Sequence, residues 1–304
     1  SHKRETAQEA PTPRILTSSH NGQEPKPVVR VGPRLQQAAK KNVLIVYAHQ
    51  EPKSFNNALL RKAVETLEAD GHSVEVSDLY AMHFNPICGR TDIVGSARDE
   101  SFFKYQMETR SALENGTLSD DIKVEMEKLK RADLVIFQFP LYWFTVPAIL
   151  KGWIDRVYVV DFAYGNGKLY SNGLLKGKRG MLSFTTGKPG TAYSDAGMNG
   201  DMNVLLWPLQ NGMLRFVGFD VLAPQIHYAA AHVSDDDRKQ WLDDWAKRLN
   251  HIFEEPSLKF VDFSNFTNTK LSDKYLEDES AKQYGPTIGQ HLSKPFSPTG
   301  MLKP

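Results

Sequence analysis

The sequence is poor in cysteine, in long apolar runs and in net charge. Its 304 residues include one cysteine, Cys88, which excludes an intrachain disulfide and a multi-cysteine metal centre. No apolar run approaches the roughly 20 residues that a membrane-spanning helix needs, and we recognise no secretory signal. The formal net charge of +1 gives no strong field for nucleic acid or an acidic membrane. We therefore expect a cytoplasmic globular protein without membrane insertion and without a nucleic-acid partner.

Short motifs of several enzyme classes are absent as well. The loop after the first expected strand has no G-x-G-x-x-G, which disfavours a Rossmann dinucleotide site there. Residues 173–178 resemble a P-loop, but they have one residue too few between the glycines and lack the following Ser or Thr. No G-x-S-x-G marks a serine hydrolase, and the few, scattered histidines predict no metal site.

The first 40 residues differ from the rest in composition. Several prolines, scattered charges and little apolar periodicity favour a disordered N-terminal tail over residues 1–40. A transit peptide is the alternative, but its acidic residues Glu5, Glu9 and Glu24 count against it, because such peptides are poor in acids. A large domain is expected over residues 41–256.

Apolar runs alternate with helical stretches through this domain. The expected strands are residues 43–48, 73–79, 133–139, 180–185 and 218–222. The expected helices are residues 55–69, 119–131, one from Pro147, one from 201 through 212 towards Phe216, and one from Ser234. Strands separated by helices predict right-handed crossovers and hence an α/β fold, a doubly wound five-stranded parallel sheet of the flavodoxin-like kind. Residues 80–117 and 257–304 show no clear pattern, and 257–304 are expected to form a C-terminal extension.

Three turns at the carboxyl ends of expected strands carry unusual residues. Residues 140–145 place tyrosine, tryptophan and phenylalanine in succession, and successive turn residues cannot all point into one core. Residues 49–56 are polar and end at a helix N-terminus, which suits a pyrophosphate. Residues 185–190 form a third polar turn. Since ligands of open α/β sheets bind at this edge, the three turns favour a planar, polar-edged ligand such as a flavin.

Longer stretches of the chain resemble one known family. They are residues 47–56, 137–153, 185–187, 200–203 and 207–210. Together they closely resemble the vertebrate NAD(P)H:quinone oxidoreductases, which comprise DT-diaphorase and a paralogue that prefers dihydronicotinamide riboside. The resemblance runs from about residue 41 to the C-terminus. It implies a flavodoxin-like FAD-binding catalytic domain, a homodimer with its active sites at the subunit interface, and ping-pong, two-electron reduction of quinones by NAD(P)H.

The same resemblance implies roles for individual residues. Those implied to hold the FAD phosphates and adenosine side are His49, Ser54, Phe55, Asn56 and Arg238. Those implied to line the flavin ring and its polar edge are Leu141, Tyr142, Trp143, Phe144, Thr185, Thr186, Gly187 and Lys188. Tyr193 and Asn199 are implied to act catalytically at the N1/O2 edge of the flavin. The quinone pocket is implied to use Trp143, Phe144 and Asn199, with Tyr164, Asn166 and Phe216 from the partner subunit.

Some positions depart from the family pattern. Asn199 stands where DT-diaphorase has a histidine, as in the paralogue, and Lys188 stands where both have glycine. Asn211 and Arg215 replace the two metal-binding histidines of the paralogue, so no metal is expected. The C-terminal region has a counterpart in DT-diaphorase only. The chain therefore combines features of both branches.

Simpler explanations remain open for these residues. Trp143 and Phe144 can be core or interface aromatics, Lys188 a solvated surface lysine, and Arg238 a helix residue paired with neighbouring aspartates. Other functions also remain open. They are a non-catalytic flavodoxin-like binding or stabilising module, an FMN-using reductase of the same fold, and a quinone reductase that prefers dihydronicotinamide riboside as donor.

Overall fold

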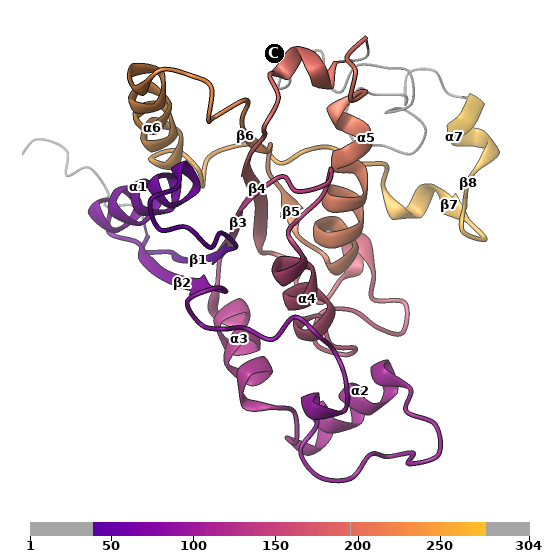
Figure 1. The fold of residues 1–304 in the computed structure, drawn as a ribbon. Coiled ribbons are helices and arrows are strands. Elements are labelled where there is room, and N and C mark those ends of the chain that lie inside the picture. Colours follow the sequence, from indigo (N-terminus) through magenta and orange to yellow (C-terminus); the bar gives the residue numbers. More distant parts are fainter. Residues whose placement is uncertain (1–38, 195, 278–304) are drawn as a thin grey trace, which may run out of the picture. The chain divides into compact units, whose positions relative to one another are not determined.

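The computed structural model describes residues 39–194 and 196–277, and its centre is one parallel β-sheet (Figure 1). The sheet has the order β2-β1-β3-β4, with β5 and β6 both paired to β4. Its strands are β1 Asn42–Tyr47, β2 Ser73–Asp78, β3 Leu134–Pro140, β4 Arg179–Thr185, β5 Asp220–Val221 and β6 Gln225–His227. This arrangement confirms the predicted flavodoxin-like α/β fold.

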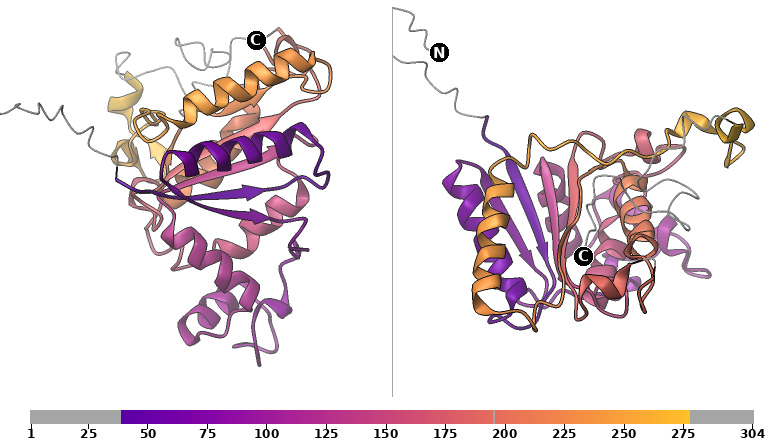
Figure 2. Two further views of the ribbon diagram at one scale, coloured as in Figure 1. Left: turned by 90° about the vertical axis from the view of Figure 1, so that its left-hand side faces the viewer. Right: turned by 90° about the horizontal axis from the view of Figure 1, so that it is seen from above.

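Helices cover both faces of the sheet (Figure 2). The helices are α1 Phe55–Ala69, α2 Tyr105–Asn115, α3 Asp120–Arg131, α4 Ala148–Val157, α5 Met202–Trp207 and α6 Asp235–Leu249. On one face, α1 and α6 bury Leu59 and Trp245 against Ile45. On the other face, α3 and α4 bury Leu129 and Trp153. The two apolar layers hold the carboxyl ends of the strands in fixed positions.

Helix α1 illustrates how the sequence determines an element of this domain. The side chain of Ser54 accepts a hydrogen bond from the backbone N–H of Asn57, which satisfies one of the free donors of the first turn. Leu59, Leu60 and Leu67 recur on the buried face. The helix ends at Ala69, before Gly71 with φ of 87°. The predicted bounds of this helix are confirmed.

The fifth strand position differs from the prediction of one strand over residues 218–222. It is split into β5, beside the start of β4, and β6, beside its end. The guanidinium of Arg248 on α6 donates to the carbonyl oxygens of Ala223 and Pro224, in the gap between the two pieces. These side-chain bonds satisfy carbonyl groups that a continuous ladder would otherwise use.

The helix predicted from residue 201 to 212 and onwards also changes character. Helix α5 ends at Trp207, a π-helix spans Pro208–Leu214, and a 3₁₀ turn spans Arg215–Val217. Proline lacks the N–H that an α-helix needs at this point, so the regular bonding pattern cannot continue through Pro208.

The connection 80–117, which showed no pattern in the sequence, contains α2 and is fastened to α4. The guanidinium of Arg156 lies 2.7 Å from Asp92 and 2.6 Å from Asp121. Gly152 allows the close approach, because a Cβ at this position would lie 2.2 Å from the carbonyl oxygen of Pro86. Arg156 therefore joins this connection and the start of α3 to α4.

The predicted extension 257–304 is described as far as residue 277 and contains short regular elements. They are a 3₁₀ turn Phe263–Asn265, a hairpin of β7 Phe266–Thr267 and β8 Lys270–Leu271, and α7 Asp273–Glu277. The predicted tail 1–40 and the rest of the extension lie almost entirely outside the described residues. Within residues 39–277, apart from 195, no helix is long and apolar enough to cross a membrane. The same part of the chain holds no group of three or more His, Cys, Asp or Glu side chains suited to a metal ion.

Candidate functional site

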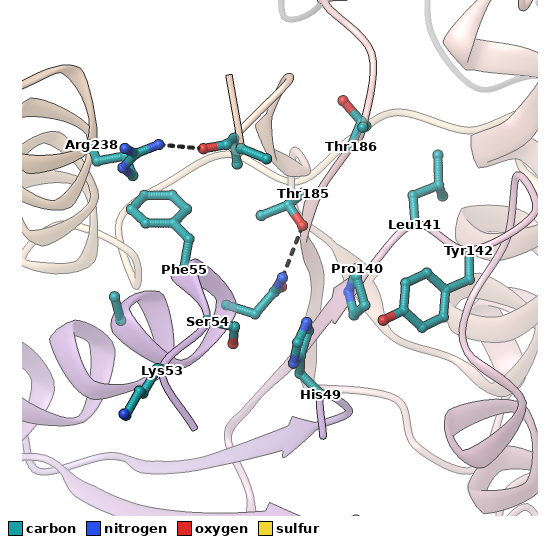
Figure 3. Close-up of a pocket in the computed structure, with 15 residues that line it drawn as sticks. His49, Lys53, Ser54, Phe55, Pro140, Leu141, Tyr142, Thr185, Thr186 and Arg238 are labelled. Atoms are coloured by element: carbon teal, nitrogen blue, oxygen red, sulfur yellow. Dashed lines mark hydrogen bonds between the residues drawn. The ribbon is translucent and has the colours of Figure 1, made fainter. Parts of the chain in front are cut away.

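A cavity of about 690 Å³ lies at the carboxyl edge of the sheet, where the three predicted turns meet (Figure 3). Ten of its lining residues were predicted as site residues from the sequence. They are His49, Ser54, Phe55, Asn56, Leu141, Tyr142, Thr185, Thr186, Gly187 and Arg238. The lining residues that the sequence did not reveal are Lys53, Ala58, Pro140, Ala230 and Ala231.

One buried hydrogen-bonded chain joins the walls of this cavity. Asn56 donates from Nδ2 to Oγ1 of Thr185 over 2.9 Å, and Gln138 donates from Nε2 to Oδ1 of Asn56 over 2.9 Å. All three side chains are buried. Asn56 thus joins α1 directly to both β3 and β4, so the start of the helix is held at the two strand ends.

The α1 end of the cavity is suited to an anion. The first amide groups of a helix have no intrahelical acceptor, and at α1 these belong to Phe55 and Asn56. Lys53 and Arg238, both lining residues, add two positive charges, and the helix dipole acts in the same direction. A phosphate group at this end would meet N–H donors and cations together.

His49 enters the cavity as a neutral donor. Its Nδ1 accepts a hydrogen bond from the backbone N–H of Glu51 over 3.0 Å. Partial burial lowers the pKa of His49 below its usual value, against the opposing effect of Glu51. The proton of the neutral ring therefore sits on Nε2.

Phe55 forms an apolar wall supported from behind. Its ring lies 5.5 Å from that of His227, edge to face, and 5.9 Å from that of Trp241. Of these two supports, His227 is almost fully buried. Burial lowers the pKa of His227 to about 4, so the ring is neutral at physiological pH.

Arg238 fits both of the explanations that the sequence allowed. It lines the cavity and donates to the carbonyl oxygen of Ala230 over 2.8 Å (Figure 3). It also pairs with Asp235 at 2.7 Å. The ion pair is partly exposed and contributes little to stability. Its effect is to fix the direction of the guanidinium.

The aromatic turn after β3 is tightly folded. Pro140 is the last residue of β3 rather than the first beyond it, and Pro147 caps α4 instead of opening it. Backbone hydrogen bonds join Tyr142 and Thr145 in both directions at 3.0 Å. The residues between them, Trp143 and Phe144, have positive φ angles of 49° and 62°. Such angles are unfavourable for bulky residues, so the fold holds both aromatics in a strained turn.

Trp143 and Phe144 do not line the cavity of the single chain. Trp143 is 93% exposed and Phe144 46% exposed, whereas Tyr142 lines the cavity and its hydroxyl meets Gln50 at 3.3 Å. Two large aromatic side chains thus stand open to solvent at the rim of the site. Neighbouring exposed aromatic side chains are typical of surfaces that bind another molecule.

Tyr193 lies one contact behind the cavity. Burial raises the pKa of Tyr193, so the phenol keeps its proton at neutral pH. The polar side chains of Asn199 and Thr186 lie near its hydroxyl and act to lower its pKa, and Thr186 lines the cavity. Lys188 is exposed and outside the cavity lining, but its carbonyl oxygen accepts a hydrogen bond from Thr186.

The residues implied to act from a partner subunit lie elsewhere in the chain. Tyr164 and Phe216 have their rings 5.8 Å apart and line a separate cavity of about 240 Å³. Asn166 is exposed, with a φ of 41°. One chain therefore does not bring these three residues to the cavity at the strand ends.

The fold and the site define a flavodoxin-like protein. A family described as having a flavodoxin-like fold matches residues 41–249, which is more than half of the chain, and the chain belongs to it. A crystal structure from Klebsiella pneumoniae, solved as a candidate quinone reductase, is 39% identical with a TM-score of 0.72. The match covers 77% of this chain and 93% of that one.

Two relatives identify the family to which this flavodoxin-like chain belongs. Rat NAD(P)H dehydrogenase [quinone] 1 is 47% identical over 270 residues, which cover 87% of this chain and 98% of the rat protein. Mouse ribosyldihydronicotinamide dehydrogenase [quinone] is 52% identical over 217 residues, which cover 71% of this chain and 94% of the mouse protein. The chain is a member of the NAD(P)H:quinone oxidoreductase family.

Proposed function

We propose that this chain is an FAD-dependent NAD(P)H dehydrogenase that reduces quinones by two electrons. The observation that carries the proposal is the cavity at the strand ends, with cations and helix N–H groups at one end and Tyr142 and Leu141 at the other. This polarity matches a ligand with a phosphate group at one end and a flat ring at the other. Family membership agrees with it.

The phosphate end would be held by several donors. Those proposed are the amide groups of Phe55 and Asn56, the Nε2 proton of His49 and the charges of Lys53 and Arg238. Ser54 caps α1 and keeps these amides in place. Phe55 offers a ring face to the adenosine side.

The ring end would lie along the turn after β3. Leu141 and Tyr142 are proposed to contact the isoalloxazine ring directly, and Trp143 and Phe144 to close over it and over the quinone. Thr185, Thr186, Gly187 and Lys188 are proposed to face its polar edge. Gly187 has open space where a Cβ would stand, so backbone can approach the ring there.

A bound flavin would supply the chemistry, because it accepts a hydride from NAD(P)H and passes two electrons to a quinone. The chain would supply orientation, exclusion of water and stabilisation of charge. Tyr193, kept protonated by burial, is the proposed donor near the edge where negative charge develops, and Asn199 is its polar neighbour. One pocket would serve donor and acceptor in turn, which gives ping-pong kinetics.

A homodimer would complete this site. Tyr164, Asn166 and Phe216 are away from the strand-end cavity of their own chain, while Trp143 is exposed beside it. A partner placed on this rim would cover the aromatic turn and bring its own Tyr164 and Phe216 to the flavin. Quinones are the proposed small-molecule partners.

The test combines flavin identification with steady-state kinetics. The purified protein is examined by mass spectrometry for released flavin, and turnover of menadione is measured with NADH, NADPH and dihydronicotinamide riboside side by side. Bound FAD and parallel double-reciprocal plots with NADH or NADPH support the proposal. Released FMN would identify an FMN-using reductase. Turnover with the riboside alone would place the chain with the paralogue in donor preference, and a folded but colourless protein would indicate a non-catalytic module.

A further inference from the structure

A third cavity, of about 410 Å³, lies between the segment 208–217 and the hairpin β7–β8. This volume is in the range of small-ligand pockets. Among the residues described, its lining consists of Leu169, Tyr170, Asn211, Arg215, Phe216, Phe263, Phe266, Asn268 and Thr269. None of them lines the cavity at the strand ends.

The cation of this cavity is Arg215, which is held between two aromatic rings. Its guanidinium carbon lies 4.8 Å from the ring centre of Tyr170 and 4.9 Å from that of Phe260. One terminal nitrogen donates to Oδ1 of Asn211 over 3.0 Å, and the other donates to the carbonyl oxygen of Val261. The side chain is therefore fixed in direction before any ligand arrives.

The charge of Arg215 has no direct counter-ion in the described part of the chain. No carboxylate there lies within the 4.0 Å of an ion pair, and Asp262 acts on it only from farther away. Burial lowers the pKa of Arg215, which shows that the surroundings disfavour its charge. Arginine nevertheless stays cationic at neutral pH. The fold has already removed much of the water around this charge. An anion bound here would therefore interact with it more strongly than in open solvent.

The remaining lining combines flat rings with a second donor. Tyr170 lies 5.3 Å from Phe216, edge to face, and 5.5 Å from Phe263 in a stacked arrangement. Asn211 accepts from Arg215 through its oxygen, which leaves its Nδ2 group as a hydrogen-bond donor beside the guanidinium. A flat ring with an acidic group would meet aromatic faces and paired N–H donors at once.

We infer that this cavity is a binding site for small aromatic acids, with Arg215 and Asn211 holding the acidic group. The ring of the ligand lies among Tyr170, Phe216 and Phe263. Phe216 is also proposed to reach the flavin of the partner subunit, but Arg215 and Asn211, which hold the acidic group, have no role in quinone reduction. The inference is therefore tested by binding and by these two residues rather than by turnover.

The test is calorimetric titration of the flavin-loaded protein with 2-naphthoate and, as a neutral match, 2-naphthamide. We expect saturable binding of 2-naphthoate and at least tenfold weaker binding of the amide. Arg215→Gln removes the charge and should weaken 2-naphthoate tenfold or more. Asn211→Asp places a carboxylate beside the guanidinium at nearly unchanged volume and should weaken it similarly. The second variant keeps the test valid if Arg215→Gln does not fold.

The matched control is Lys176→Gln, which removes one exposed positive charge from the neighbouring surface without touching the lining of this cavity. It should bind 2-naphthoate like the wild type. Equal binding of acid and amide, or unchanged affinity in both cavity variants, would overturn the inference. So would acid binding that appears only after residues 278–304 are deleted, since the chain would then fill its own cavity.

Discussion

Asn56 at the start of α1 and Thr185 at the end of β4 are joined by a buried hydrogen bond of 2.9 Å across 129 positions of sequence. This bond sets the distance between the proposed phosphate end and the proposed polar edge of the flavin site. Because Asn56 also accepts from Gln138 on β3, a single amide joins the start of α1 to two strand ends.

Asn56→Leu should loosen the site. Losing this side chain leaves the Nε2 group of Gln138 without its acceptor in a buried position, which costs about 1–3 kcal/mol. We expect a lower melting temperature and poorer retention of FAD, measured by thermal melts with and without added flavin. Asn115→Leu, at the exposed end of α2, is the control and should change neither.

Trp143→Ala should affect the site and not the fold of the chain. A buried tryptophan would cost about 3–5 kcal/mol on truncation, but this side chain is almost entirely exposed. We expect a nearly unchanged melting temperature for the flavin-free protein, together with weaker FAD retention and slower turnover. Wild-type flavin affinity and turnover in the variant would show that Trp143 does not cover the flavin.

Tyr193→Phe should slow flavin reduction while FAD stays bound. Loss of one donor to developing charge costs on the order of 3 kcal/mol, or roughly 100-fold in rate. Stopped-flow reduction by NADH gives the rate. Tyr228→Phe is the matched control, because its ring lies 5.9 Å from that of Tyr193 and we propose no role for its hydroxyl. Reduction of Tyr193→Phe at the wild-type rate would remove Tyr193 from the mechanism.

Asn199→His should speed reduction and make it depend on pH near neutrality. An asparagine amide can donate a hydrogen bond but takes up no proton at these pH values, whereas histidine can become a cation beside the same edge. Stopped-flow reduction between pH 5.5 and 8.5, compared with the wild type, measures the effect. A flat profile in the variant would show that position 199 does not face the developing charge.

Acid should destabilise the domain through His227. Its pKa is about 4 in the folded chain and about 6.5 when unfolded, so the unfolded chain binds more protons between these values. The stability present above pH 6.5 is therefore lost as the pH falls towards 4, by about 3 kcal/mol. Denaturant unfolding of the wild type and of His227→Phe across this range measures the difference, and the variant should show a smaller pH dependence.

The residues near strand ends could be predicted from the sequence because strand ends follow from apolar runs. The cavity positions of His49 and Phe55 came from that rule, whereas the bounds of α1 followed from its cap at Ser54 and from Gly71. Ala230 and Ala231 could not be predicted in this way. They follow β6, which has three residues and no apolar alternation, so the sequence did not indicate a strand end there. The exposure of Trp143 could not be predicted either, because composition does not tell whether an aromatic turn is covered by its own chain.

The resemblance seen in the sequence extends to the C-terminus, and the relatives differ in how much of the chain they match. The rat match covers 87% of this chain and the mouse match 71%, although the mouse protein is slightly more similar where it aligns. The rat protein therefore matches a longer part of this chain than the mouse protein does.

The split of the outer strand into β5 and β6 has a consequence for association between chains. An unbroken outer strand presents a row of free N–H and C=O groups on which a foreign strand can pair. Here Arg248 takes up carbonyl groups in the gap, and the N–H of Leu258 donates to Val221 on the outer side. This margin of the sheet is therefore a poor template for strand addition, which protects the protein from edge-to-edge aggregation.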